Sequence, residues 1–402
     1  MSSRIMKLED CVLLIIDCRG KTPQKLGSSW VNKGIRVISA NNVHDGMLTD
    51  ENEIRCVDDI TYHKWMKESV QRGDCFLVSE GATLGESLYW DSDEKVVLGQ
   101  RLYAIRTKKD ILDSKYFSLY LRTSICRKFI NAISTGSTVF GISQKDLLRL
   151  EIVVPDIFVQ KKIGELKYEI DKKIQNNKII NAELESMAKT IYDYWFLQFD
   201  FPDENGKPYK SSGGKMVWNE ELKREIPEGW EVKKIQDILT KISTTKKYKL
   251  DEYGKGNKYP IIDQSSKYIC GYTDDENELL CLEDCIVFGD HTKCVKYVNF
   301  AFARGADGTQ VINSSISNLP NYILYRQILD MDLVSQGYSR YFKFLKDKYV
   351  IAPQKNVSES FMEGIKGSLN KMKHIINENR ELESLRDFLL PLLMNGQVGF
   401  KQ

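Results

Sequence analysis

The tetrapeptide ELES occurs twice in this chain, in "NAELESMAKTIYDYWF" (Asn181–Phe196) and in "NRELESLRDFLLPLLM" (Asn379–Met394). The second copy follows the first by 198 residues. Pro353, which ends "KYVIAP", also follows Pro155, which ends "EIVVP", by 198 residues. An offset that stays constant over roughly forty residues indicates an internal duplication rather than a chance match of four letters. We therefore expect both halves of the chain to contribute the same kind of element.

Both copies of the repeat lie in long segments with helical spacing. Apolar residues recur at steps of three and four from Gln160 to Trp195 and again from about Ser358 to Leu393, which predicts two amphipathic helices with a heptad-like stripe. Asn177 falls on the first stripe, where a polar residue often fixes the register of a coiled coil. The predicted coiled-coil and subunit-interface positions are Ile163, Leu166, Ile170, Ile174, Ile180, Leu184, Met187, Ile191, Ile365, Leu369, Met372, Ile376, Leu382, Leu385, Leu389 and Leu392.

A globule precedes each predicted helix. Residues 1–153 and 230–352 alternate short apolar runs with Gly, Asn and Asp, which is typical of strands and turns. The helices occupy residues 154–197 and, with the C-terminal tail, 353–396. Residues 198–229 are rich in Pro, Gly and Lys and are typical of a connector. The globules match only in outline, so we expect them to do different things on one scaffold.

This order predicts an α+β protein with two β-rich globules, each followed by a long helix. Two equivalent units in one chain usually pair about a pseudo-two-fold axis, so we expect the helices to form an antiparallel coiled coil. The first half starts at "SSRIMKLED" without the "IPEGW" segment (Ile226–Trp230) of the second half, and we expect its edge to be built differently. About 36 helical residues span roughly 54 Å, longer than one DNA turn of about 34–36 Å.

That length suits a protein that reads two separated DNA half-sites, but a two-domain coiled-coil scaffold without DNA recognition explains the pattern as well. Composition leaves both open. The chain has 402 residues, 42% of them hydrophobic and 28% charged, and a net charge of +2, so any DNA-binding charge must be local. Nine scattered cysteines suggest free thiols in a reducing cytosol. The short run "CVLLII" (Cys11–Ile16) is typical of a strand rather than a signal peptide.

Four stretches resemble the specificity subunits of type I restriction–modification systems. "ELESLRDFLLPLLMNGQV" (Glu381–Val398) is similar to the terminal helix of that family. "YWFLQFDFP" (Tyr194–Pro202), followed by "GKPYKSSGG" (Gly206–Gly214) and "IPEGWEVKKIQDI" (Ile226–Ile238), resembles its central connector. The duplication of globule and helix extends the resemblance over essentially the whole chain.

The resemblance implies that each globule is a target recognition domain contacting one half of a bipartite, asymmetric DNA sequence. It implies that the helices set the unread gap between the halves. It also implies that the helices dock two methyltransferase subunits, which bind S-adenosylmethionine and methylate adenine, and that restriction subunits with translocase and nuclease activity can join. The specificity subunit of such a complex is not catalytic and binds no cofactor, and we expect it in the bacterial or archaeal cytoplasm, at the nucleoid. A related alternative is a specificity module that serves a methyltransferase without restriction.

Motifs for chemistry in the chain itself are weak. The sequence has no "DPPY" or "NPPF" segment and no phosphate-binding P-loop. Asp156, Glu165 and Lys167 superficially resemble a nuclease pattern, but the last two fall two apart in a predicted helix and so on different faces. Cys281, Cys285, His291 and Cys294 have an unusual spacing for structural zinc. Because Cys285 occupies the place of Cys75 at the start of an apolar strand, we predict a buried free thiol instead.

DNA recognition needs Lys and Arg for phosphates, and Arg, Asn, Gln, Ser or Thr for base edges, on loops carried by a rigid scaffold. In the first globule the predicted contacts are Lys21, Thr22, Gln24, Asn41, Asn42, Thr83, Gln100, Arg101, Ser137 and Thr138. In the second they are Thr244, Thr245, Lys246, Lys247, Gln264, Ser265, Ser266, His291, Arg304, Ser339, Arg340 and Lys343. Any single one of these lysines can equally be a solvated surface residue.

Overall fold

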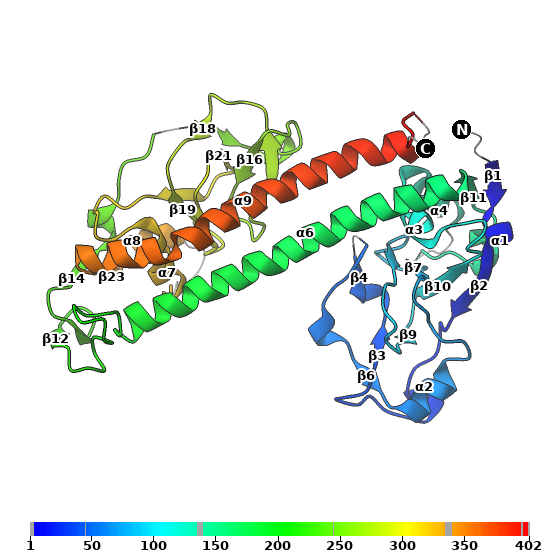
Figure 1. Cartoon of the computed structure of the whole chain (residues 1–402), viewed down its shortest axis with the longest axis horizontal. Helices are drawn as coiled ribbons and strands as arrows, with labels where there is room; N and C mark the ends of the chain where they lie inside the picture. The colour runs from blue at the N-terminus through cyan, green and yellow to red at the C-terminus, as the bar shows by residue number, and fades with distance from the viewer. Residues whose placement is uncertain are drawn as a thin grey trace. The chain divides into compact units, whose positions relative to one another are not determined.

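The chain forms two compact units, each with one globule and part of each long helix. The computed structural model describes residues 4–44, 46–134, 140–243, 245–333, 340–394 and 397–400. Unit 1 consists of residues 1–175 and 381–402, and unit 2 of residues 176–380. The second unit is thus one continuous segment, whereas the first is assembled from both ends of the chain (Figure 1).

The two predicted helices are α6 (Ile157–Tyr192, 36 residues) and α9 (Lys355–Met394, 40 residues). In unit 1 the beginning of α6 meets the end of α9, because Ile163 and Leu393 share a buried cluster. In unit 2 the end of α6 meets the beginning of α9, where Tyr192 and Phe361 share another. In each unit, therefore, the start of one helix packs beside the end of the other, which confirms the antiparallel pairing.

Polar contacts between the helices support the same pairing. In unit 2 the buried Asn177 amide donates to Glu378 Oε2 at 2.7 Å and to Asn379 Oδ1 at 2.8 Å, which confirms its predicted seam position. In unit 1 Arg386 of α9 lies 3.4 Å from Asp171 of α6. A buried amide paired in this way fixes the register because any shift would leave it without a partner.

The buried stripe does not follow the predicted positions along its whole length. Ile163, Ile170 and Ile174 are buried, but Met187 and Ile191 are exposed. The side chains buried there are Ala188 and Tyr192, one residue later in each case. An α-helix drifts by about 20° per heptad relative to a strict 3.5-residue repeat. The seam therefore moves one position along α6, and our predicted seam is wrong at those two residues and at Ile180, which is also exposed.

The stripe of α9 shifts in the same way near its end. Ile365 and Leu369 are buried as predicted, and Met372, Ile376, Leu382, Leu389 and Leu392 are half-buried. Leu385 is exposed, and Ile375 and Leu393 take the buried places beside Ile376 and Leu392. On α6, Leu166 and Leu184 are half-buried, while Ile180 is 38% exposed.

The globule of unit 1 is built on short strands with five helices around them. The helices before α6 are α1 (Leu8–Cys11), α2 (Asp59–Trp65), α3 (Ser114–Leu121), α4 (Ser124–Ile133) and α5 (Gln144–Leu147). Its strands are β1 (Arg4–Lys7), β2 (Val12–Asp17), β3 (Ile35–Ile38), β4 (Val43–His44), β5 (Met47–Leu48), β6 (Cys56–Val57), β7 (Cys75–Val78), β8 (Ser87–Tyr89), β9 (Val97–Leu98), β10 (Leu102–Thr107) and β11 (Glu151–Val154). They form sheets in the orders β2-β10-β7-β8 and β6-β3-β9, and the pairs β1-β11 and β4-β5.

The globule of unit 2 has more strands and fewer helices. Its helices before α9 are α7 (Asn321–Leu329) and α8 (Tyr341–Lys346). Its strands are β12 (Met216–Asn219), β13 (Arg224–Pro227), β14 (Glu231–Lys234), β15 (Lys247–Tyr248), β16 (Tyr259–Ile262), β17 (Gly271–Thr273), β18 (Leu279–Leu280), β19 (Cys285–Gly289), β20 (Val295–Val298), β21 (Phe302–Gly305), β22 (Thr309–Ile312) and β23 (Tyr349–Ala352). The orders are β20-β19-β22 and β15-β21-β16-β17 with β18 against β21, and the pairs β12-β13 and β14-β23.

The two globules share their strand pairing. β7 lies between β10 and β8, as β19 lies between β22 and β20, and all four neighbours are antiparallel. β3 runs parallel to β9, as β16 runs parallel to β21. The duplication seen in the helices therefore extends through the globules, more closely than their sequences indicate.

The outer edge of each globule is also the same. β1 pairs with β11 through Arg4 and Val154, and β14 pairs with β23 through Glu231 and Ala352. Ala352 follows Val154 by 198 residues, so the two pairs have one register. Our expectation of a differently built edge for the first globule is wrong at this strand pair.

Residues 198–229 are more than a linker. They contain the β12–β13 hairpin, and Phe199, Phe201 and Ile226 are buried in the main core of unit 2. The ring of Phe201 stacks on Trp230, with 5.2 Å between ring centres. Because these aromatic side chains are separated by polar loop residues, the sequence shows no periodicity where the chain nevertheless packs tightly.

Candidate nucleic-acid interface

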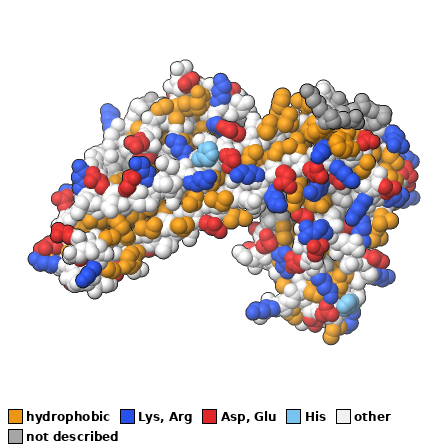
Figure 2. Space-filling model, in the orientation of Figure 1, with side chains coloured by type: hydrophobic (Ala, Val, Ile, Leu, Met, Phe, Trp, Pro, Cys, Tyr) orange, Lys and Arg blue, Asp and Glu red, His pale blue; other side chains and the backbone are white. Residues whose placement is uncertain are grey.

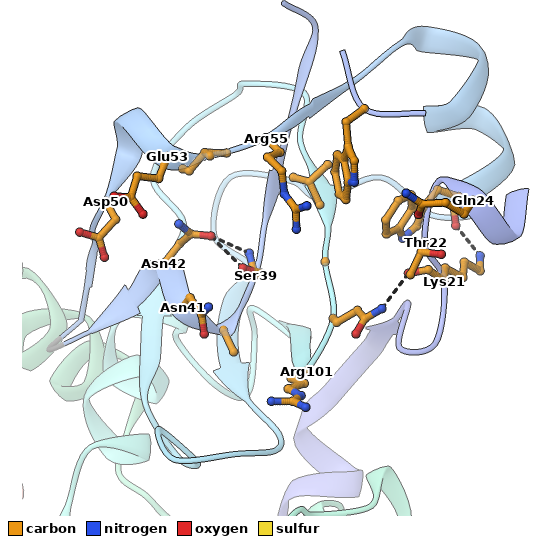
Figure 3. Close-up of a pocket in the computed structure, with 17 residues that line it drawn as sticks. Lys21, Thr22, Gln24, Ser39, Asn41, Asn42, Asp50, Glu53, Arg55 and Arg101 are labelled. Carbon is orange, nitrogen blue, oxygen red and sulfur yellow. Dashed lines mark hydrogen bonds between the residues drawn. The ribbon is translucent and has the colours of Figure 1, made fainter. Parts of the chain in front are cut away.

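The polar residues predicted in the first globule meet in a cleft of about 520 Å³. The cleft lies where three segments come together: residues 21–24 after β2, residues 39–42 at the end of β3, and residues 99–101 between β9 and β10. Because β3 and β9 run parallel, their ends lie at one edge, which is why segments sixty residues apart in sequence become neighbours. In Figure 3, Asp50 and Glu53 lie on one side of the opening and Lys21 and Gln24 on the other.

Seven of the ten predicted contacts of this globule line the cleft: Lys21, Thr22, Gln24, Asn41, Asn42, Gln100 and Arg101. Thr83 lies in the nearby loop after β7 but does not line it, and Ser137 and Thr138 fall outside the described residues. Asn42 is buried, and its Oδ1 accepts from the Ser39 backbone N–H at 3.1 Å and Oγ at 2.9 Å. Its amide thus holds the loop together, and the exposed Asn41 is the better candidate for a DNA contact.

Two cleft cations are held in different ways. Lys21 Nζ donates to the carbonyl of Trp65 and is therefore tied to the wall of the cleft. Arg101 is half exposed, with its Nε 3.4 Å from Glu80 Oε1. An exposed ion pair of this kind contributes at most about 1 kcal/mol and is easily exchanged. Arg101 is thus the cation best able to turn toward a ligand.

No sequence motif marks five further charged or aromatic residues of the cleft. Trp30, Asp50, Glu53, Arg55 and Trp65 also line it. The Arg55 guanidinium lies 4.1 Å from the centre of the Trp30 ring, within the range of a cation–π contact. These residues are scattered over 36 positions without a motif, so only the folded chain brings them together.

In the second globule the corresponding edge is centred on Gln264, which follows β16. Its Nε2 donates to the Asp307 carbonyl at 3.0 Å, and its Oε1 accepts from the His291 backbone N–H at 3.1 Å. Lys247 Nζ lies 3.4 Å from Asp307 Oδ1. The structure thus joins three of the predicted residues, Gln264, His291 and Lys247, around the loop between β21 and β22.

A buried polar network supports Gln264 from below. Asp263 accepts from Tyr253 Oη at 3.0 Å, and its carbonyl accepts from the buried Lys296 Nζ at 2.8 Å. Burial alone would raise the pKa of Asp263, but hydrogen bonds from Cys270, Ser265 and Tyr253 outweigh it and lower the pKa. A carboxylate held ionised in this way gives the loop a rigid base.

The other residues predicted in this globule do not lie together around Gln264. Arg304 donates to the Thr309 carbonyl at 2.9 Å, and burial lowers its pKa, so it faces the backbone of its own loop. Lys246 pairs with Glu252. Arg340 and Lys343 are exposed around α8, while Thr245 and Ser265 are half-buried. Ser266 lines a separate cavity of about 440 Å³ beside α9. Thr244 and Ser339 lie outside the described residues.

The surface charge is mixed rather than concentrated. On the face shown in Figure 2, Lys and Arg side chains are interspersed with Asp and Glu over both units. This agrees with a net charge of +2. Contacts to DNA phosphates would therefore come from individual loops and not from one continuous basic face.

Cys75 and Cys285 begin β7 and β19, and both are buried free thiols, as predicted. The two are not equivalent, however, because the strand pairings place Ile286 at the position of Cys75, so that prediction is wrong by one residue. Burial raises the pKa of Cys285 to about 12, so it is not a thiolate near neutral pH.

Among the described residues, no group of three or more His, Cys, Asp or Glu side chains is arranged to hold a metal ion. Nor is any described helix long and apolar enough to span a bilayer.

Comparison with known proteins identifies relatives of one kind. Residues 5–186 match the family model of the type I restriction modification DNA specificity domain. The MjaIX specificity subunit of Methanocaldococcus jannaschii is 29% identical over 320 residues, which cover 73% of this chain and 71% of that protein. The HindI specificity subunit of Haemophilus influenzae is 20% identical over 414 aligned residues, covering 83% of this chain and 88% of the relative.

A solved structure agrees with these matches at the level of the fold. The S subunit of a type I restriction-modification system from M. genitalium superimposes with a TM-score of 0.61, at 13% identity, over 98% of this chain and 96% of that one. The paired helices, the duplicated globules and these matches lead to one conclusion. The chain is similar to type I restriction–modification specificity subunits and has the fold of one of them, and its residues 5–186 match the DNA specificity domain of that family.

Proposed function

We propose that this chain recognises a bipartite, asymmetric DNA target, with each globule reading one half-site. The observation that carries the proposal is that one strand scaffold presents two different polar sets at the same edge. The edge of unit 1 carries Asn41, Gln100 and Arg101, and the edge of unit 2 carries Gln264 and His291. Two equivalent readers with different side chains fit a target whose halves differ in sequence.

In this proposal the chain itself performs no chemistry. It directs methyltransferase subunits to the target, and those subunits bind S-adenosylmethionine and transfer its methyl group to adenine. Restriction subunits can join the same complex. The support is that the polar groups gathered at both edges are donors and acceptors suited to base edges and phosphates.

The test of this function is a comparison of DNA methylation in cells with and without the chain, each expressing the partner methyltransferase. Long-read sequencing of modified bases should find a bipartite motif that is methylated only when the chain is present. If the methylation pattern is the same in both, with the partner shown to be active, the scaffold alternative is favoured and the recognition role is not.

The exposed apolar residues of the helices support a second part of the proposal, the docking of two methyltransferase subunits. Met187 on α6 is 59% exposed, and Leu385, which follows it by 198 residues on α9, is 47% exposed. Each lies near the end of its helix, Met187 in unit 2 and Leu385 in unit 1. Equivalent exposed side chains at two repeat positions fit two copies of one partner.

We expect Met187→Glu and Leu385→Glu each to remove one methyltransferase subunit from the complex. A charge in the centre of an apolar contact has to be desolvated, so binding should weaken by at least tenfold at the altered site only. The measurement is the mass of the complex in solution. The matched controls are Leu250→Glu and Ile60→Glu, at positions 77% and 68% exposed on the globules. A complex that keeps both partner copies in the Met187 and Leu385 variants would contradict the assignment.

A further inference from the structure

The loops at the two reading edges correspond residue by residue, because they make the same backbone hydrogen bonds. In unit 1, the N–H of Ser79 just after β7 donates to the Arg101 carbonyl at 2.9 Å. In unit 2, the N–H of Asp290 just after β19 donates to the Gly308 carbonyl at 2.8 Å. The next residues of the central sheets, Leu102 and Thr309, continue the pairing. Arg101 and Gly308 therefore occupy the same position.

A second position corresponds in the same way. The N–H of Gly85 donates to the carbonyl of Val78, the last residue of β7, at 3.0 Å. The N–H of Lys293 donates to the carbonyl of Gly289, the last residue of β19, at 2.9 Å. Gly85 and Lys293 are therefore equivalent.

All four residues have left-handed backbones. The φ angles are 64° at Arg101 and 92° at Gly308, and 86° at Gly85 and 59° at Lys293. This conformation favours glycine, because a Cβ crowds the following carbonyl oxygen. Each globule thus has one glycine and one cation at these two positions, but in opposite order. The cation of unit 1 lies between β9 and β10, and the cation of unit 2 lies in the hairpin between β19 and β20.

Local packing explains the glycine of unit 2. A Cβ built on Gly308 would lie 2.7 Å from both Gln264 Nε2 and His291 Cδ2, so the two polar residues fill the space that a longer side chain would need. A Cβ on Gly85 would lie 3.6 Å from Ile130 of α4, which is an ordinary van der Waals contact, so packing does not exclude a side chain at that position of unit 1.

Both cations are available to a ligand. The Arg101 side chain is half exposed at the cleft. Lys293 is exposed, its Nζ lies 4.5 Å from the centre of the Tyr341 ring, and it is two residues from His291. Both globules thus hold a long cationic side chain in a strained backbone conformation at the same edge. Strained backbone conformations of this kind cluster at functional sites.

We propose that Arg101 and Lys293 are specificity-determining residues, one for each half-site, and that each donates to the acceptor edge of a guanine in the major groove. Arg and Lys are the side chains best suited to guanine O6 and N7. This inference rests on the proposed function. It assigns a base-reading role to Lys293, which no sequence motif marks.

The test uses the full chain with its partner methyltransferase, and methylated motifs are mapped by long-read sequencing for each variant. We expect Arg101→Gly to relax the requirement for one guanine in one half-site by about tenfold or more. Lys293→Gly should relax one guanine in the other half-site only. The control is Lys223→Gly, which removes a lysine with φ of 51° from the loop between β12 and β13 and should leave the motif unchanged.

The possible results distinguish a failure of the proposed function from a failure of the base-reading role. The melting temperature of each glycine variant should not fall by more than a few degrees, because glycine suits the left-handed backbone. Absence of any methylated motif for the unaltered chain would overturn the proposed function. If the unaltered chain defines a motif, and both glycine variants either retain it fully or lose methylation evenly at all its positions, the base-reading role is overturned.

Discussion

Matched four-residue insertions after Gln175 in α6 and after Arg380 in α9 are expected to abolish methylation of the natural target. Methylation should reappear at targets with an unread gap longer by about two base pairs. Each helical residue adds about 1.5 Å, so four add about 6 Å, and the DNA rise is about 3.4 Å per base pair. Both insertion points are the boundaries between the two units, so neither globule is interrupted.

The length of the insertion is chosen to preserve the helix faces. Four residues exceed one turn of 3.6 residues only slightly, so side chains beyond the insertion keep nearly the same direction. A four-residue insertion in the turn at Asn205, which lies outside both helices, should leave the gap unchanged. Recovery of the natural gap in the helix-insertion protein would contradict the proposal that the helices set the spacing.

Phe361→Ala is expected to lower the free energy of unfolding by about 3–5 kcal/mol, the range measured for truncating a buried aromatic residue. Phe361 is 1% exposed. Its ring centre lies 4.9 Å from that of Phe196, 5.7 Å from that of Trp195 and 6.4 Å from that of Tyr322. One side chain of α9 thus contacts the helical turn that follows α6 (Asp193–Leu197) and the globule helix α7, and its removal leaves a cavity where all three meet.

Denaturant unfolding followed by tryptophan fluorescence measures this loss, because Trp195 lies in the same cluster. The control is Phe344→Ala on α8, where the ring is 38% exposed, and the loss there should be about 1 kcal/mol or less. Equal losses in the two variants would show that the aromatic cluster is not the centre of unit 2.

The helical part of the fold could be predicted because it is a local pattern repeated without gaps. An amphipathic helix is defined by residues three and four apart, and the offset of 198 residues survives over its whole length. Asn177 was also predicted to lie on the seam, but its partners Glu378 and Asn379, which define the register, were not. The pattern did not predict the shift of the buried seam to Ala188 and Tyr192. That shift depends on the 3.6-residue helical turn and on the aromatic side chains of unit 2, which pack against this end of α6.

The structure of the globules was harder to predict from the sequence than that of the helices. Between β7 and β19 the offset is 211 residues, and across the following loops it falls to 207, because loops of different length separate equivalent strands. Comparison at a fixed offset therefore misses equivalences that the hydrogen bonds make plain. Seven of the 17 residues that line the cleft of unit 1 were predicted, because polar loop residues follow strands. Arg55 and Lys293 were missed, since neither a ring contact nor a left-handed backbone has a signature in isolated sequence.

The division of the chain also determines the order in which the protein can fold during synthesis. Unit 2 is continuous, so all of its residues have been synthesised before the last part of α9 is made. Unit 1 is different, because Leu393 is buried in the same cluster as Ile163 and Leu389 packs against that cluster. The globule that is translated first must therefore wait for the residues after Arg380 to close its core. A chain that stops before Leu389 would contain every residue of unit 2 but would leave the core of unit 1 open, and such a species is exposed to proteases and chaperones.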